Sequence, residues 1–199
     1  GTTGWPRGVM LTNGNHFASA AASRAHLGML SEDRWLVVLP LYHVGGLAIV
    51  FRSVLDGVAI VLHSRFDPAR AAAALRQEGV TLVSLVPTML FRLLEHDGGR
   101  PFPPSLRCVL VGGGPARPAL LERALGMPVA PTYGLTEAAS QVATAAAGDA
   151  VRRPESAGKV LPGTRLRISE PDASGCGEIL VHGPTVMAGY FRQHQATAR

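Results

Sequence analysis

Four short apolar runs, separated by segments with helical periodicity, constrain the fold of this sequence more than any other feature. The runs are "WLVVLPL" (35–41), "GVAIVL" (57–62), "VTLVSLV" (80–86) and "LRCVLVGG" (106–113). Unbroken apolar runs of this length predict strands that are buried on both faces, as in parallel sheets. Strand and helix in alternation therefore predict an α/β fold, a three-layer sandwich with a mostly parallel sheet.

The segments between these runs carry signals for where helices begin and end. In "FDPARAAAALRQEG", Asp67 is the expected N-cap, Pro68 the first helical residue and Gly79 the stop. Two further amphipathic helices are predicted in "VPTMLFRLLEH" and "PARPALLERALG", and Pro115 marks the start of the second. These helices would connect the predicted strands.

After about residue 145 the pattern of apolar residues changes. "TRLRIS" and "GEILVHGP" alternate with the two-residue period of half-exposed strands, and a turn rich in Pro, Ser and Gly separates them. We therefore expect an α/β subdomain over 1–145 and the start of a small antiparallel β subdomain over 146–199. The second unit looks incomplete, because only the polar, helix-like "GYFRQHQATAR" follows its strands.

Length and composition exclude several protein classes. A chain of 199 residues can build one ordinary domain, or one and a fraction, with a sizeable core. The apolar share of 47% and the charged share of 17% exclude a disordered tail. No run reaches the ~18 apolar residues that a membrane span needs. We therefore expect a soluble protein.

The charge and the cysteines indicate the kind of partner and the compartment. A net charge of +5, carried almost wholly by arginine, suits polyanionic small molecules. No basic run or aromatic-basic stripe points to nucleic acid. Cys108 lies in an apolar run and Cys176 in a polar turn, so neither a metal cage nor a disulfide is expected. We therefore expect a cytoplasmic protein with small-molecule partners.

The stretch "GTTGWPRG" (1–8) has the composition of a phosphate-binding loop. Thr2 and Thr3 place two hydroxyls among Gly1, Gly4 and Gly8. Glycines let backbone N–H groups converge, and this geometry suits a polyphosphate. The stretch does not match G-x-x-x-x-G-K-[ST], so the residues alone leave a flexible turn as the alternative.

A second glycine-rich stretch, "VLVGGGPARPAL", follows a predicted buried strand. Gly112, Gly113 and Gly114 end this strand, and Pro115 comes next. Ligands of open α/β sheets bind at the carboxyl ends of the strands, where glycine lets a ring lie against the backbone. The alternative is an ordinary tight turn between a strand and a helix.

The stretch "PTYGLTEAASQ" gathers the most chemistry in the fewest residues. Tyr133 offers a π-face, Gly134 space, Thr136 a hydroxyl and Glu137 a carboxylate. A stacked base, a phosphoryl oxygen and a magnesium ion need such groups. The alternative for the carboxylate is a solvated cap.

His43 ends a predicted apolar strand and precedes two glycines. The residues alone leave two interpretations of this histidine, a hydrogen-bonded packing residue or an acid–base group.

Taken in order, these stretches resemble the motifs of the adenylate-forming superfamily of acyl- and aryl-CoA synthetases, luciferases and peptide-synthetase adenylation domains. The motif [ST]-[SG]-G-T-T-G-x-P-K-G is similar to "GTTGWPRG", where Arg7 stands at the usual lysine position. The other two motifs correspond to "YGLTE" and "GEILVHGPTVMAGY". Among subfamilies, "LPLYHVGGLAIV", "SAGKVLPG" and "GYFRQ" most resemble the o-succinylbenzoate–CoA ligases of menaquinone synthesis.

The resemblance implies a role for each matching position. The loop that embraces the β- and γ-phosphates of ATP would comprise Gly1, Thr2, Thr3, Gly4, Arg7 and Gly8. The residues that border adenine and the acyl pocket would be Gly112, Gly113, Gly114 and Pro115. Tyr133 would stack on the adenine ring, and Gly134 would leave space for it. The resemblance also implies that Thr136 touches the α-phosphate, Glu137 holds magnesium and His43 lines the carboxylate pocket.

The implied reaction is that of an ATP-dependent carboxylate–CoA ligase. A substrate carboxylate attacks the α-phosphorus of ATP, while Mg²⁺ and the loop offset the charge on the departing pyrophosphate. The thiol of coenzyme A then opens the acyl-adenylate. The implied partners are thus a small carboxylate, ATP and CoA, with neither nucleic acid nor a membrane span, and homo-oligomerisation of the parent protein stays open.

Several parts of the family pattern have no counterpart in the 199 residues. These are the N-terminal subdomain ahead of the loop, the downstream TGD aspartate, the hinge and the C-terminal domain with the adenylation lysine. We therefore expect an internal fragment of the large N-terminal domain that is inactive alone. The alternatives are another acyl- or aryl-CoA synthetase, a peptide-synthetase adenylation domain that uses a carrier protein, and a folded module without catalysis.

Overall fold

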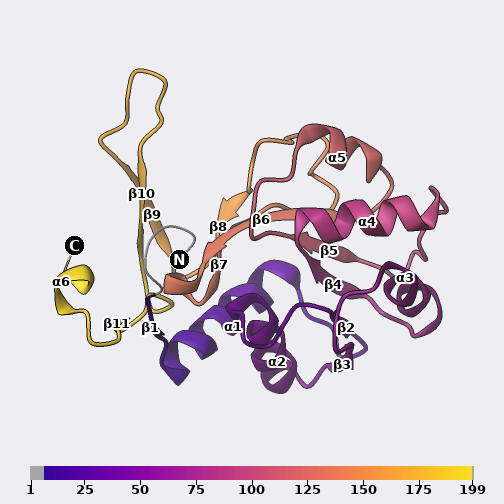
Figure 1. The fold of residues 1–199 in the computed structure, drawn as a ribbon, viewed down its shortest axis with the longest axis horizontal. Coiled ribbons are helices and arrows are strands. Elements are labelled where there is room, and N and C mark those ends of the chain that lie inside the picture. The colour runs from indigo at the N-terminus through magenta and orange to yellow at the C-terminus, as the bar shows by residue number, and fades with distance from the viewer. Residues whose placement is uncertain (1–6, 199) are drawn as a thin grey trace.

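A seven-stranded sheet forms the centre of the computed structural model, which describes residues 7–198 (Figure 1). The strand order is β3-β2-β4-β5-β6-β7-β8. The parallel strands are β2 (Arg34–Val37), β3 (Ala59–Leu62), β4 (Leu82–Leu85), β5 (Cys108–Val111) and β6 (Val129–Leu135). The antiparallel strands β7 (Ser140–Thr144) and β8 (Lys159–Val160) extend the sheet beyond β6. The predicted α/β class with a mostly parallel sheet is confirmed.

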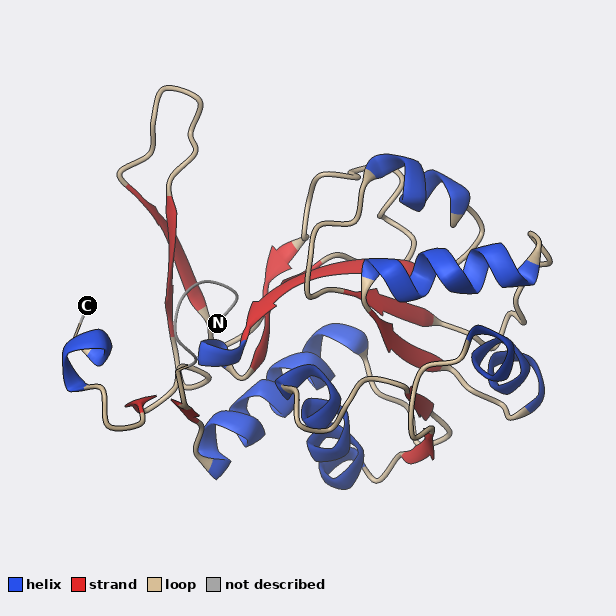
Figure 2. Ribbon diagram, in the orientation of Figure 1, coloured by secondary structure: helices blue, strands red, loops and turns tan. Residues whose placement is uncertain are grey.

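Helices cover both faces of this sheet (Figure 2). One face carries α1 (Asn13–Leu27) and α2 (Val44–Asp56). The other face carries α3 (Pro68–Gln77), α4 (Pro87–Asp97) and α5 (Pro118–Arg123). Two separate apolar clusters lie on the two sides of the sheet, which confirms the three-layer arrangement. None of the helices in residues 7–198 is long and apolar enough to cross a membrane.

Alternation along the central strands explains why their sequences are almost entirely apolar. Trp35 and Val37 belong to the cluster beneath α2, whereas Leu36 and Val38 belong to the cluster beneath α3 and α4. All four side chains are buried. Successive side chains of a strand point to opposite faces, so a strand covered on both sides is apolar at nearly every position. The buried Ser84 of β4 is polar, and its hydroxyl accepts a hydrogen bond from Trp35 Nε1 at 3.2 Å.

The helix signals predicted for α3 are confirmed. The Asp67 side chain accepts a hydrogen bond from the backbone N–H of Arg70 at 2.9 Å, and Pro68 is the first helical residue. The helix ends at Gln77, and Gly79 then adopts a positive φ of 64°. The side-chain cap satisfies one of the backbone donors that a helix N-terminus leaves without a partner.

Two local predictions are wrong. The run that forms β3 is not buried on both faces: Ile60 and Leu62 are exposed, because β3 is the edge strand of the sheet. The helix after the glycines begins at Pro118, not at Pro115. Arg117 has φ −64° and ψ 144°, the extended conformation that a following proline favours, so the helix cannot begin before Pro118.

The C-terminal part contains short antiparallel pairs. The strands β9 (Arg165–Ser169) and β10 (Glu178–His182) form a hairpin that projects from the body of the molecule (Figure 1). The strand β11 (Gly189–Tyr190) pairs with β1 (Val9–Met10) and is followed by α6 (His194–Thr197). The predicted antiparallel strands are confirmed, whereas the boundary at 145/146 stays a prediction.

Candidate functional site

The carboxyl ends of four parallel strands meet at one edge of the sheet. The strands β2, β4, β5 and β6 are consecutive neighbours in the sheet order. The predicted residue His43 follows β2, the three glycines 112–114 follow β5, and Tyr133 lies within β6. The topology therefore places these residues along the edge where open α/β sheets bind their ligands.

Gly112 brings the end of β5 against β6. Its N–H donates to the Leu85 carbonyl of β4 at 3.1 Å. A Cβ atom at this position would lie 2.7 Å from Cγ2 and 3.0 Å from the carbonyl oxygen of Thr132. Only glycine fits there, directly beside the residue that precedes Tyr133. The predicted strand-to-helix turn is thus also the point where β4, β5 and β6 approach one another.

We expect Gly112→Ala to lower the free energy of unfolding of the chain by about 1–3 kcal/mol, because the new methyl group overpacks a fixed backbone. Gly114→Ala is the matched control, since a Cβ atom there meets nothing within 4 Å. It should change stability by less than about 0.5 kcal/mol. Urea unfolding, followed by tryptophan fluorescence to which the buried Trp35 contributes, measures both. Equal effects would contradict the close approach.

A tight turn joins β6 to β7 and carries Thr136 and Glu137. A Cβ atom on Gly134 would lie 1.8 Å from the carbonyl oxygen of Ser140, and the strand register shifts between Tyr133 and Gly134. Ser140 itself has a φ of 99°, which is unfavourable for a residue with a side chain. Such strained backbone concentrates at functional sites. The turn therefore gives Glu137 a closely defined backbone.

Glu137 contacts a segment that is distant in the sequence. The hydroxyl of Tyr190 donates a hydrogen bond to Glu137 Oε1 at 2.8 Å. This bond raises the pKa of Tyr190, since ionisation would place two negative charges side by side. The Arg7 guanidinium carbon lies 5.2 Å from the centroid of the Tyr190 ring, which is within cation–π range. Residues of all three motifs, Arg7, Glu137 and Tyr190, therefore meet.

Backbone pairing between β1 and β11 explains why Arg7 and Tyr190 lie together. In the register of β1 and β11, Val9 lies opposite Tyr190, and the N–H of Phe191 donates to the Gly8 carbonyl at 2.7 Å. The helix α1 secures the same region, because the amide of Asn15 donates to the carbonyls of Pro184 and Val186 at 2.8 and 2.9 Å. The end of the predicted phosphate loop is thus joined to the third motif.

The carboxylate of Glu137 fits the requirements of a magnesium ligand. Oε1 accepts the bond from Tyr190, and no hydrogen bond among residues 7–198 uses Oε2. Mg²⁺ is usually bound through one or two carboxylates, water and substrate phosphates. One free carboxylate oxygen in a cluster with Tyr190 and Arg7, where Arg7 lies near the end of the predicted phosphate loop, is compatible with that mode of binding.

The described contacts do not join all the predicted residues. Gly1, Thr2, Thr3 and Gly4 lie outside the described residues. His43 is the N-terminal flanking residue of α2, and its ring lies 4.7 Å from that of Tyr42. Thr136 is exposed and Pro115 lies in the segment before α5. Among residues 7–198, the side-chain hydrogen bond of Glu137 is with Tyr190 and not with Thr136. Their roles in a site stay predictions.

Tyr190 is the one contact residue that the sequence reasoning did not single out. It was visible only as one letter of the stretches "GEILVHGPTVMAGY" and "GYFRQ". Its separation from the "YGLTE" stretch gave no sign of contact. A pattern of conserved tyrosine and glutamate pairs is the kind of signal that indicates such a contact.

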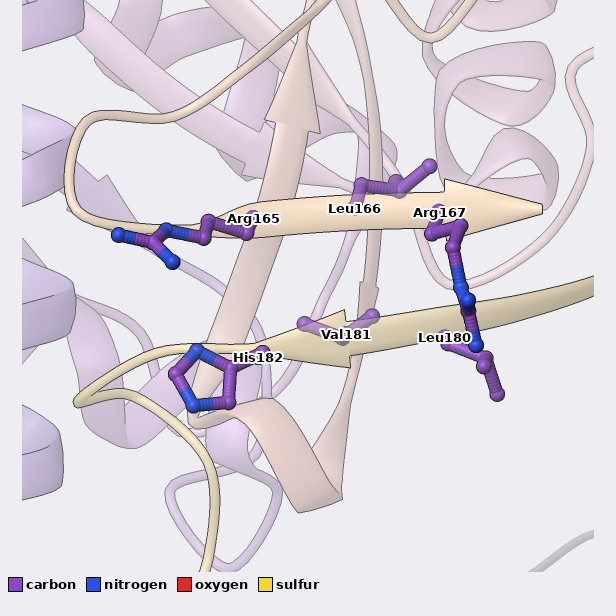
Figure 3. Close-up of a pocket in the computed structure, with 6 residues that line it drawn as sticks. All are labelled: Arg165, Leu166, Arg167, Leu180, Val181 and His182. Atoms are coloured by element: carbon purple, nitrogen blue, oxygen red, sulfur yellow. The ribbon is translucent and has the colours of Figure 1, made fainter. Parts of the chain in front are cut away.

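A shallow hollow of about 250 Å³ lies elsewhere, on the hairpin of β9 and β10 (Figure 3). Its lining residues are Arg165, Leu166, Arg167, Leu180, Val181 and His182. Arg165 lies directly opposite His182 in the strand register. None of these residues belongs to the site predicted from the sequence. The hollow therefore shares no residue with the cluster of Arg7, Glu137 and Tyr190.

Comparison with known proteins identifies the family of the chain. Residues 1–191 match the family of AMP-binding enzymes, and the chain belongs to this family. Among curated relatives, the 2-succinylbenzoate–CoA ligase of Bacillus cytotoxicus is 44% identical over 203 residues, covering 99% of this chain and 42% of the relative. The resemblance inferred from the motifs is confirmed.

Solved structures of one relative match over the whole chain. The o-succinylbenzoate coenzyme A synthetase of Bacillus subtilis in complex with ATP and magnesium ion has a TM-score of 0.91 and 42% identity. The same enzyme in complex with the acyl-adenylate intermediate OSB-AMP has a TM-score of 0.92 and 42% identity. Each match covers 100% of this chain and 42% of the other chain, so the chain spans less than half the length of these relatives.

Proposed function

We propose that the chain is the nucleotide-binding part of an ATP-dependent 2-succinylbenzoate–CoA ligase. The observation that carries the proposal is the meeting of Arg7, Glu137 and Tyr190, one residue from each of three motifs. The identity of 44% with a curated 2-succinylbenzoate–CoA ligase supports the choice of substrate. The complexes of the B. subtilis synthetase with ATP and with OSB-AMP support the nucleotide and the intermediate.

The proposed reaction has two halves. First, an oxygen of the substrate carboxylate attacks the α-phosphorus of ATP, the bond to the β-phosphate oxygen breaks and pyrophosphate leaves. Then the sulfur of CoA attacks the acyl carbonyl, AMP leaves and a thioester remains. When bound, a magnesium ion supplies positive charge that neutralises phosphate oxygens. Glu137 is the residue that would hold it.

The side chains along the sheet edge bind and orient the substrates. Tyr133 offers its ring to adenine, and the glycines after β5 leave room for the base against the backbone. Thr136, exposed on the turn after β6, donates its hydroxyl to an α-phosphate oxygen. His43, exposed at the start of α2, lines the pocket of the carboxylate. The β- and γ-phosphates lie against the loop that ends at Arg7 and Gly8.

An exchange assay on the full-length protein tests the proposal. We expect the exchange of labelled pyrophosphate into ATP to depend on o-succinylbenzoate. The label enters ATP when pyrophosphate attacks the acyl-adenylate, and the adenylate forms only if a substrate carboxylate is present. Fatty acids and simple aryl acids serve as comparison substrates. Exchange with a fatty acid but not with o-succinylbenzoate would replace the proposed substrate. Absence of exchange with every carboxylate would overturn the ligase.

The same preparation identifies the thiol acceptor. We propose free CoA, since the chain resembles ligases named for it along 99% of its length. Addition of CoA should convert the adenylate to a thioester that is detected by mass spectrometry. Failure to form the thioester, with exchange intact, would favour a carrier-protein acceptor.

We also propose a cytoplasmic location. This proposal is supported by the two cysteine thiols, Cys108 and Cys176, which are both free.

A further inference from the structure

The segment 187–190 holds Glu137 at two places. The backbone N–H of Met187 donates to the Glu137 carbonyl at 2.8 Å. The Tyr190 hydroxyl donates to Glu137 Oε1, also at 2.8 Å. Both the backbone and the carboxylate of Glu137 therefore depend on the same short segment. A carboxylate fixed at one oxygen can no longer rotate freely about its side-chain bonds.

The ring of Tyr190 is itself fixed from several sides. Its backbone N–H donates to Oγ1 of Thr197 at 2.9 Å, and its backbone is part of β11. The Arg7 guanidinium lies over the ring face. Figure 1 shows β1 and β11 side by side. The phenol hydroxyl is thus held at a defined place before any ligand binds.

We propose that Tyr190 is a positioning residue for the metal ligand Glu137. Its hydroxyl occupies Oε1 and leaves Oε2 as the single oxygen directed to a divalent cation that accompanies ATP. This inference rests on the proposed function. Partners that orient a ligating carboxylate typically change metal affinity by about 10–100-fold when they are removed.

A purely structural role for Tyr190 predicts a different outcome. The packing of Arg7 uses the ring face, and the bond to Thr197 uses the backbone. The hydroxyl donates to Glu137 Oε1, and the nearby Arg7 guanidinium partly offsets the rise that this bond causes in the pKa of Tyr190. Tyr190→Phe therefore removes the contact with the carboxylate and keeps the ring and the β1–β11 pairing. The variant separates positioning from folding.

The test compares full-length wild-type protein with Tyr190→Phe. We expect the Mg²⁺ concentration for half-maximal ATP–pyrophosphate exchange to rise about tenfold, with little change in the KM for the carboxylate. The second readout is calorimetric binding of ATP with Mg²⁺ and of ATP in the presence of a chelator. In the wild type Mg²⁺ should strengthen ATP binding, and in Tyr190→Phe this advantage should shrink about tenfold.

Thr197→Val is the matched control, because it removes the bonds of Thr197 Oγ1 to the Tyr190 backbone N–H and the Gln193 carbonyl but leaves the Tyr190 hydroxyl in place. It should leave the Mg²⁺ dependence unchanged, because the β1–β11 pairing and the Arg7 contact still hold the Tyr190 ring. An unchanged or tighter Mg²⁺ dependence in Tyr190→Phe overturns the positioning role, and so does an equal shift in Thr197→Val. If wild-type protein shows no exchange with any carboxylate, the proposed function fails, and the binding titrations still decide the role of Tyr190.

Discussion

Glu137→Gln in the full-length protein is expected to slow ATP–pyrophosphate exchange by about 100-fold, the usual size of the loss when one preorganised electrostatic contact to a transition state is removed. The amide is as large as the carboxylate and can still accept the bond from Tyr190, so the turn should keep its structure. What is lost is the negative charge that would hold Mg²⁺. Initial rates at several Mg²⁺ concentrations measure the effect.

Glu178→Gln is a suitable control, because Glu178 is an exposed acid on β10 and is far from the turn in sequence. It should keep the wild-type rate within about twofold, as surface substitutions usually do. Circular dichroism of both variants should match the wild type. A Glu137→Gln enzyme with an unaltered rate and Mg²⁺ dependence would remove Glu137 from the metal site.

The class of the fold was predictable because its signals are local. Unbroken apolar runs mark β2, β4 and β5, and a capping residue with a following proline marks the start of α3. The order of the strands carries no such local signal. For that reason the exposure of β3 was missed: an apolar run has the same letters in the centre of a sheet and at its edge.

The candidate site was predictable only in pieces. Each motif indicates its chemistry through residues that are close in the sequence, such as Tyr133, Thr136 and Glu137. The contact between Glu137 and Tyr190 depends instead on β1 and β11, two strands of two residues each. So short a strand has no periodicity to detect, and its pairing is decided by tertiary packing. The sequence therefore indicated the chemical groups of the site but not how they are arranged in space.

A largely buried ion pair supports the fold at the opposite edge of the sheet, where the parallel strands begin. The side chain of Asp33 is 0% exposed and that of Arg107 is 25% exposed. Arg107 Nε donates to Asp33 Oδ1 at 2.7 Å, and the hydroxyl of Thr81 donates to the same oxygen at 2.7 Å. The N–H of Leu30 donates to Oδ2 at 2.8 Å. These bonds join the starts of β2, β4 and β5.

We expect Asp33→Ala to lower the free energy of unfolding by about 3 kcal/mol, because it leaves the Arg107 cation partly buried without its partner. Glu32→Gln is the control: Glu32 is exposed beside Asp33, and its loss should cost less than about 0.5 kcal/mol. Urea unfolding at pH 7, followed by tryptophan fluorescence, measures both variants. In Asp33→Ala/Arg107→Met the loss should be smaller than the sum of the two single losses.

The pH dependence gives an independent check. Burial raises the pKa of Asp33, but the hydrogen bonds from Arg107, Leu30 and Thr81 outweigh it, and the net pKa is lowered. A lowered folded-state pKa stabilises the protein fully above the unfolded-state value of about 4, and this contribution is lost as the pH falls through the folded-state pKa. The difference in stability between wild type and Asp33→Ala should therefore stay constant from pH 7 to about 5 and narrow below about 4. A difference that persists unchanged into that acid range would mean that the Asp33 charge does not support the junction of the three strands.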